Sequence, residues 1–218
     1  MMMLIALPLA LATPAPSDPT STPVLVENPV SVEDDYPTDS FRAGEQGYVL
    51  SSVVVSPEGK ALRCDTIEST GYKRLDDATC AAVLKHGRFK PARDAEGKPV
   101  HGIFNFSFFW LNPNYPSQME AVQKRGRPFI PDLDITVAKL PQSEPGPVII
   151  RVAVVVSAQG EALHCAAQGR VALPALASVA CQEAMAVNFP TPVTDSRGAA
   201  VVSVRGVVVR FSVSGPVQ

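Results

Sequence analysis

The chain contains one pattern twice, and this internal repeat constrains its fold more than any other feature. Residues 53–80, VVVSPEGKALRCDTIESTGYKRLDDATC, return at 154–181 as VVVSAQGEALHCAAQGRVALPALASVAC. The offset is constant at 101 positions, from Cys64 to Cys165 and from Cys80 to Cys181. Further identities at this offset include Val54, Val55, Ser56, Gly59, Ala61, Leu62, Leu75, Pro91, Asp94, Gly97 and Val100. A fixed period indicates one structural unit that is used twice.

The first copy has the pattern of a β-hairpin, a helix and a further strand. A Val-rich run at 48–56 and a return strand at 61–68 flank the turn Pro57-Glu58-Gly59, in which Pro and Gly supply the backbone angles that a turn needs. Residues 74–88 carry an apolar stripe at helical spacing. Residues 89–99 are expected to form a loop, and the aromatic run at 103–110 a third strand. A short helix is expected at 40–45, with Thr38 or Asp39 as its N-cap.

The second copy predicts the same elements. Strands are expected at 148–157, 161–166 and 201–213, with a helix at 174–188 and a bulge or kink at Gly206. Residues 134–140 are expected to form a further short strand or the lead-in to the second copy. The predicted fold class is therefore α+β, with two tandem β-β-α-β units that each pack a three-stranded antiparallel sheet on one helix.

Four cysteines occur as two pairs of equal spacing, which is typical of a disulfide framework in an exported chain. A Cys64–Cys80 bond would pin the second strand to the helix, and Cys165–Cys181 would do the same in the second copy. Each bond would close a loop of about 16 residues and contribute on the order of 3 kcal/mol. No C-x-x-C motif favours a redox site instead.

The composition and the N-terminal residues indicate an exported, folded protein with two domains and two linkers. Of its 218 residues, 46% are apolar and 18% are charged, and the net charge of −2 gives no footprint for nucleic acid. Residues 1–12 form a short apolar run with Ala10 and Ala12 placed for cleavage, so we expect a signal peptide or, if the start is truncated, a clipped anchor. The expected boundaries are 1–12 for this signal, 13–34 for a disordered Pro-rich linker, 35–111 for the first domain, 112–147 for a second linker, and 148–214 for the second domain.

No pattern for catalysis or metal binding is present. His86, His101 and His164 stand singly, without carboxylates or cysteines at metal-ligand spacing, and no nucleophile or phosphate-binding motif occurs. We therefore expect no enzyme activity, no metal and no cofactor.

Residues 35–102 resemble the C-terminal domain of TonB energy transducers. The features that carry the resemblance are Tyr36-Pro37, Gly44, Gly47, Pro57, Gly59, Ser69, Gly71, Leu75-Asp76, Arg88-Phe89-Lys90-Pro91-Ala92 and Gly97-Lys98-Pro99-Val100. The paired cysteines are similar to those of a periplasmic branch of this family. The second copy resembles a degenerate version, which keeps Gly160, Leu176, Phe189, Pro192 and Gly198 but lacks the Tyr-Pro pair and the basic run.

The resemblance implies a periplasmic protein that binds a peptide of an outer-membrane receptor by strand addition, in TonB-dependent transport. An exposed sheet edge offers unpaired N–H and C=O groups to an extended peptide. The candidate partner-binding residues are Arg88, Lys90, Ile103, Phe104, Asn105, Phe106, Ser107, Phe108, Phe109 and Trp110. Most of these aromatic side chains are expected in the core, whereas exposure of Phe109 or Trp110 would favour binding.

The chain departs from the family by its second copy and by the lack of a convincing membrane span in its sequence. The alternative is therefore a soluble periplasmic binding or scaffold module that kept the fold without energy transduction.

Overall fold

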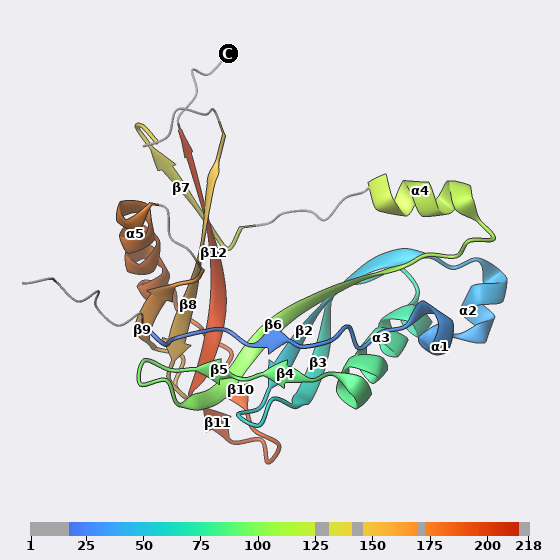
Figure 1. The fold of residues 1–218 in the computed structure, drawn as a ribbon, viewed down its shortest axis with the longest axis horizontal. Coiled ribbons are helices and arrows are strands. Elements are labelled where there is room, and N and C mark those ends of the chain that lie inside the picture. The colour runs from blue at the N-terminus through green and yellow to red at the C-terminus, as the bar shows by residue number, and fades with distance from the viewer. Residues whose placement is uncertain (1–17, 125–130, 141–145, 170–172, 214–218) are drawn as a thin grey trace, which may run out of the picture.

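The computed structural model describes residues 18–124, 131–140, 146–169 and 173–213, and the signal peptide expected at 1–12 lies outside them. Helices and strands are mixed in this part of the chain, in agreement with the α+β class (Figure 1). In chain order the elements are β1 (Val24–Leu25), α1 (Val32–Asp35), α2 (Thr38–Ala43), β2 (Gly47–Val55), β3 (Ala61–Glu68), α3 (Lys73–His86), β4 (Phe89–Lys90), β5 (Ala92–Arg93), β6 (Pro99–Trp110), α4 (Pro116–Lys124), β7 (Leu133–Val137), β8 (Val148–Val156), β9 (Ala162–Ala167), α5 (Pro174–Met185), β10 (Val193–Thr194), β11 (Ala200–Val201) and β12 (Ser203–Val213).

One eight-stranded sheet runs through the molecule, with the main order β3-β2-β6-β12-β8-β9. We call residues 31–124 the first half and residues 131–213 the second half. The long strands within each half are antiparallel neighbours. The halves meet where β6 and β12 pair in parallel, His101 with Ser203 and Gly102 with Val204, and a buried apolar cluster of Ala92, Ala153, Val155 and Val204 spans this junction. The sequence predicts a three-stranded sheet for each half, but the junction between the two sheets is a finding of the structure.

The two long helices cover opposite faces of this sheet. Paired residues on neighbouring strands point to the same face, so Gly102 and Val204 share one. On β6 this is the face of Phe104, which packs against the core beneath α3. On β12, Val207 points to the opposite face from Val204 and packs in the core beneath α5. α3 and α5 therefore lie on opposite sides.

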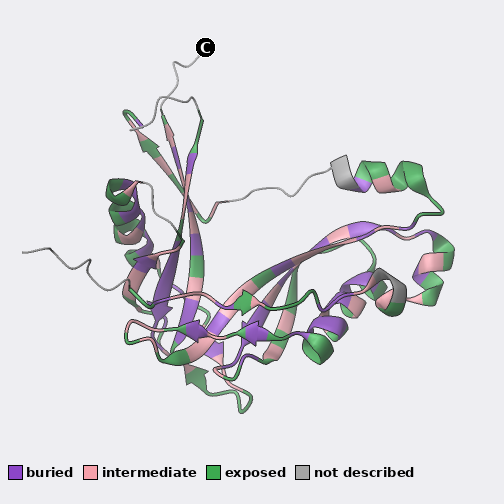
Figure 2. Cartoon of the chain, in the orientation of Figure 1, coloured by how far each residue is buried: buried purple, intermediate pink, exposed green. Residues whose placement is uncertain are grey.

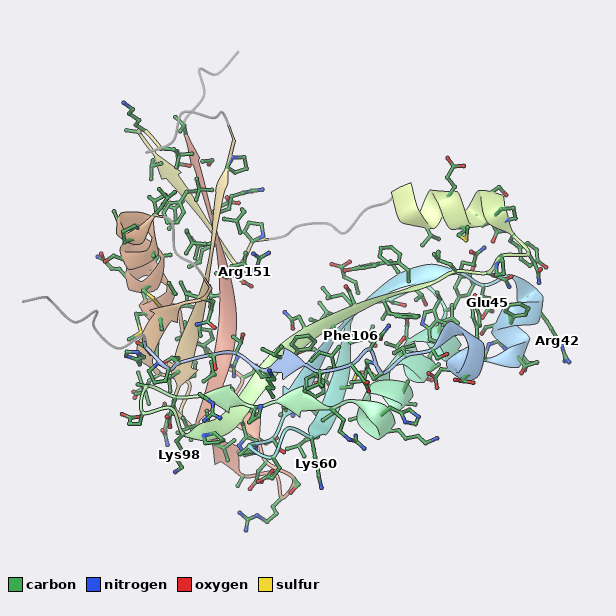
Figure 3. All side chains as sticks on the ribbon, viewed as in Figure 1. Arg42, Glu45, Lys60, Lys98, Phe106 and Arg151 are labelled. Carbon is green, nitrogen blue, oxygen red and sulfur yellow. A yellow bond between two sulfur atoms is a disulfide. The ribbon has the colours of Figure 1, made fainter. Side chains whose placement is uncertain are left out.

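The core of the first half lies between α3 and strands β2, β3 and β6. Leu75 and Val83 of α3 are fully buried there, and Phe106, labelled in Figure 3, belongs to the same cluster. Trp110 at the end of β6 is also fully buried, and its Nε1 donates to the hydroxyl of Thr79 at 2.8 Å. A disulfide joins Cys64 on β3 to Cys80 on α3.

The core of the second half likewise lies between one helix and the sheet, here between α5 and strands β8 and β12. Val152, Val154 and Phe211 on β8 and β12 are fully buried against Ala180 of α5. Figure 2 shows buried residues along β8 and on part of α5. A disulfide joins Cys165 on β9 to Cys181 on α5.

Loop contacts recur in the two halves. The Ser56 hydroxyl accepts the N–H groups of Glu58 and Lys60 in the first hairpin, and the Ser157 hydroxyl accepts those of Gln159 and Glu161 in the second. The glycines of the two hairpin turns also adopt similar backbone conformations. Gly59 and Gly160 have φ of 77° and 91°, and a Cβ on either would lie 2.1 or 2.3 Å from the carbonyl oxygen of Phe89 or Phe189. Only glycine fits both the backbone angle and this close approach.

Residues 18–30 form an extended segment, which we call the strap, in contact with both halves. Its β1 pairs with β4 of the first half, and Val30 is buried in the first core. On the second half, the Gln168 amide donates to the carbonyl oxygen of Thr20 at 3.0 Å, and His164 Nε2 lies 2.7 Å from the Asp18 carboxylate. The sequence predicts disorder for 13–34 because this stretch lacks apolar periodicity. The strap is ordered instead through backbone pairing, which needs no such pattern.

Other boundaries differ in detail from the sequence expectations. The loop expected at 89–99 contains β4 and β5, and β6 begins at Pro99 rather than at residue 103. The linker expected at 112–147 contains α4 and β7. The N-cap of α2 is Pro37, without a side-chain hydrogen bond, rather than Thr38 or Asp39. Gly206 causes no bulge, because the pairing of β12 with β8 is unbroken from Ser203 to Phe211.

We expect the protein to lose stability in alkaline solution because of the Tyr36 phenol. Its O–H donates to the carbonyl oxygen of Glu45, and its ring contacts the rings of Phe41 and Trp110. Burial, with a smaller effect of the Glu45 carboxylate, raises the pKa of Tyr36 to about 12, against about 10 in an unfolded chain. Between these values the unfolded state releases the proton and the folded state keeps it, so stability falls as the pH rises.

Because Tyr36 is partly exposed, solvent screening limits this contribution to about 1 kcal/mol. The measurement is urea denaturation of the natural chain and of Tyr36→Phe at pH 8.5 and pH 11. All other side chains are the same in both proteins, so the natural chain should lose more stability than the variant. Equal losses would show that Tyr36 does not contribute.

Candidate functional site

The outer edge of β6 is open over most of its length. Its inner edge pairs with β2 from Gly102 to Trp110, whereas in the described ranges no strand pairs with its outer edge beyond Gly102. Backbone groups of a strand alternate between its two neighbours. The N–H and C=O groups of Asn105, Ser107 and Phe109 therefore point away from β2, toward the open side.

The direction of this alternation follows from β12. The N–H of Val208 donates to the Asp132 carboxylate at 2.7 Å, and the N–H of Asp132 donates to the carbonyl oxygen of Val208 at 2.8 Å. Even-numbered residues of β12 thus turn their backbone groups away from β8, and Gly206 does so between the two paired regions. In a parallel ladder, a residue bonds to the two residues that flank its partner on the other strand. Even-numbered residues of β12 pair with even-numbered residues of β6, so the odd-numbered residues of β6 turn their backbone groups toward β12.

A groove of about 530 Å³ lies where the two strands separate. β6 and β12 meet at one end and diverge from there (Figure 1). The residues of the two strands that line the groove are Ile103, Phe104, Asn105, Arg205, Gly206, Val207 and Val208. The groove therefore joins the open edge of β6 to the short open stretch of β12.

Different segments close the two faces of the groove. Thr22 and Pro23 of the strap lie on the face of α3, where a Cβ on Gly102 would stand 2.6 Å from Pro23 Cγ. Val187 and Phe189, which follow α5, lie on the other face and pack against the second core. A chain that enters the groove would have apolar neighbours above and below.

Arg205 is the cationic side chain of this groove. Its guanidinium lies 5.2 Å from the centre of the Phe189 ring, and one Nη donates to the carbonyl oxygen of Thr191. Its Nε is buried without a hydrogen-bond partner among the described residues. Burial lowers the pKa of Arg205, which stays charged at neutral pH because arginine starts above 12.

The residues predicted from the sequence separate into three sets. Ile103, Phe104 and Asn105 line the groove, and the open edge continues through Ser107 and Phe109. The side chains of Phe106, Phe108 and Trp110 face the first core, and Phe109 is partly exposed against Tyr48. The full burial of Trp110 favours a structural role for this side chain.

Arg88 and Lys90 lie elsewhere. Lys90 belongs to β4, which pairs with the strap, and its side chain is exposed. Arg88 lines a separate hollow of about 410 Å³, together with Lys60 and Lys85. Neither side chain lines the groove beside β6, so the structure does not bring them together with the predicted edge.

Sequence reasoning missed Arg205, Phe189 and the strap as parts of the site. Arg205 stands beside Gly206 in a Val-rich strand, and a cation inside such a strand is a signal that could have been followed. No pattern pointed to Thr22 and Pro23, because their position depends on a fold formed by residues far along the chain.

Metal and membrane-spanning features are not seen in the part of the chain that the structure describes. No group of three or more His, Cys, Asp or Glu side chains is arranged there to hold a metal ion. None of the described helices combines the length and the apolar character that crossing a membrane requires.

The open strand edge lies within a segment that is similar to known proteins. Residues 32–109 match the family described as Gram-negative bacterial TonB protein C-terminal. The match covers the first half up to the end of β6, close to the domain expected at 35–111. The TonB-like segment thus contains the open edge, while Arg205 and Phe189 lie beyond it.

Curated relatives give the same indication over a shorter stretch. Protein TonB of Neisseria meningitidis serogroup C is 42% identical over 55 residues, which are 25% of this chain and 19% of that protein. Protein TonB of serogroup A / serotype 4A of the same species gives the same values. The match therefore spans about a fifth of the length of these relatives. No solved structure gave a significant match.

Proposed function

We propose that this protein acts in the periplasm as a TonB-like partner of outer-membrane receptors and binds an extended receptor peptide along β6. The observation that carries the proposal is the open outer edge of β6 within the segment that matches the TonB C-terminal family. An extended peptide would satisfy the N–H and C=O groups of Asn105, Ser107 and Phe109 by adding one strand.

We further propose that the second half is a degenerate copy of the same unit. The recurrence of the hairpin contacts, of the glycine conformations and of the strand-to-helix disulfide supports this origin. In this view the copy gave up receptor binding and became a partner of the first half. Its β12 then caps one end of β6 and leaves the remainder open.

A titration followed by NMR tests the binding mode. A synthetic peptide from the periplasmic extension of a TonB-dependent receptor is added to the isotope-labelled protein, and backbone amide shifts are recorded. We expect the largest shifts at Asn105, Ser107 and Phe109, and small shifts on the opposite edge at β3. A peptide that leaves residues 103–110 unperturbed would exclude this mode.

A matched pair of variants separates backbone pairing from side-chain contact. Ser107→Pro removes an outward N–H and should weaken peptide binding about tenfold or more, since a strand-addition hydrogen bond is lost and its neighbours are disturbed. Ser107→Ala keeps the N–H and should bind like the natural chain. Trp110 fluorescence checks that both variants are folded. In a separate experiment, a peptide N-methylated at alternate residues should fail to bind the natural chain. Equal binding by both variants would argue against strand addition.

A further inference from the structure

Arg205 places an uncompensated positive charge inside the groove between β6 and β12. Its one hydrogen bond goes to a neutral carbonyl oxygen, and in the described ranges it forms no ion pair. Arg210 on the same strand differs, because it pairs with Asp134. Partly buried charges usually have a partner of opposite sign, so the missing partner of Arg205 is a candidate feature of a ligand.

The surrounding groups do not supply that partner. Asp132 lines the same groove, but its carboxylate accepts the N–H of Val208 at the edge of β12. Phe189 lies beside the guanidinium, and the Arg205 side chain as a whole is partly exposed. A carboxylate that approached the guanidinium could form the bidentate hydrogen bonds for which arginine is suited.

We propose that the groove holds an extended peptide with an acidic side chain, whose carboxylate binds Arg205 while its backbone pairs with β6. This inference rests on the proposed function and adds to it a partner chemistry and a role for the second half. Arg205 would determine specificity, whereas the open backbone edge would accept any extended chain.

The two faces of the groove define the pattern of this peptide. Side chains of a strand alternate between faces, and odd-numbered residues of β6 and β12 share the face of Arg205 and Phe189. The acidic residue would point to that face. Its two neighbours would point to the face of Pro23 and Phe104, where apolar side chains fit. The expected ligand is therefore an acidic residue flanked by apolar residues in an extended segment.

Two synthetic peptides test this specificity. The first is acetyl-Thr-Val-Thr-Val-Glu-Val-Thr-Val-Thr with a fluorescent label, and the second has Gln in place of Glu. Fluorescence anisotropy gives the affinity of each for the natural chain, Arg205→Gln, Arg205→Lys and Arg197→Gln. Arg197 is a matched control for charge, because its side chain is 86% exposed on a loop outside the groove.

We expect the Glu peptide to bind the natural chain about tenfold more tightly than the Gln peptide, as a charge-assisted hydrogen bond would provide. Arg205→Gln should abolish this preference, Arg205→Lys should retain part of it, and Arg197→Gln should leave it intact. Amide shifts should include Gly206 as well as Asn105.

Three results would overturn the inference. Equal affinities for both peptides, with amide shifts along β6, would remove the role of Arg205 and leave strand addition standing. A preference for Glu that survives in Arg205→Gln would place the acid-binding group elsewhere. Absence of binding by both peptides would exclude the proposed ligand pattern, and the receptor-peptide titration would then decide the proposed function separately.

Discussion

Replacement of Trp110 by alanine should lower the free energy of unfolding by about 4 kcal/mol. The side chain is fully buried, contacts the rings of Tyr36 and Phe108, and donates a hydrogen bond to Thr79. Removal of a buried Trp leaves a cavity that the surrounding core cannot fill, which typically costs 3–5 kcal/mol, roughly in line with this value. Urea denaturation followed by far-UV circular dichroism measures the loss, because the variant lacks the single Trp of the chain.

Two comparisons make this prediction specific. Trp110→Phe keeps an aromatic ring but loses the N–H donor, so about 1–2 kcal/mol should be lost. Phe109→Ala removes the neighbouring aromatic from the opposite, partly exposed face of β6 and should cost less than Trp110→Ala. If Trp110→Ala were no more harmful than Phe109→Ala, Trp110 would not be the core residue that the structure indicates.

Removal of the Cys64–Cys80 disulfide, by changing both residues to alanine, should destabilise the first half by about 3 kcal/mol. The bond links positions 16 residues apart and restricts the unfolded chain by closing that loop. Trp110 fluorescence reports this half alone, because the single Trp lies in its core. The midpoint of the fluorescence transition in urea should therefore move to lower concentration.

The second disulfide is the matched control. Cys165→Ala with Cys181→Ala removes a bond of equal sequence separation from the other half. Because Cys165 and Cys181 pack against the second core and Trp110 lies in the first, we expect this variant to shift the circular dichroism transition and to change the Trp110 transition less than the first variant does. Equal shifts of the fluorescence transition by both variants would mean that the halves unfold together. Thiol titration of the unreduced, unfolded natural chain should detect no free thiol.

Sequence reasoning was most successful where structure depends on neighbours along the chain. The predicted strand at 61–68 coincides with β3, and the predicted hairpin turns place Gly59 and Gly160 at positive φ. The predicted helices at 74–88 and 174–188 correspond to α3 and α5 within a few residues at their ends. These elements follow from side-chain period and turn chemistry, which are local properties.

The site was only partly predictable. The aromatic strand was identified, and residues 103–105 do line the groove, yet Arg88 and Lys90 lie on other surfaces. The basic residues precede β6 closely in sequence, but β4 and the strap hold them away from its outer edge. Arg205 is about a hundred positions further along the chain, and the parallel pairing of β6 with β12 brings it into the groove that Ile103 also lines.

The sequence by itself showed the repeat and the equal spacing of the cysteine pairs, and it predicted the hairpins and the two long helices. Only the tertiary structure decided that the two sheets join at β6 and β12, that the strands then diverge, and that the strap and Arg205 enclose the resulting groove. The reason is physical. Pairing between distant strands uses backbone N–H and C=O groups, which nearly every residue possesses, so the choice of partner leaves little trace in the order of side chains.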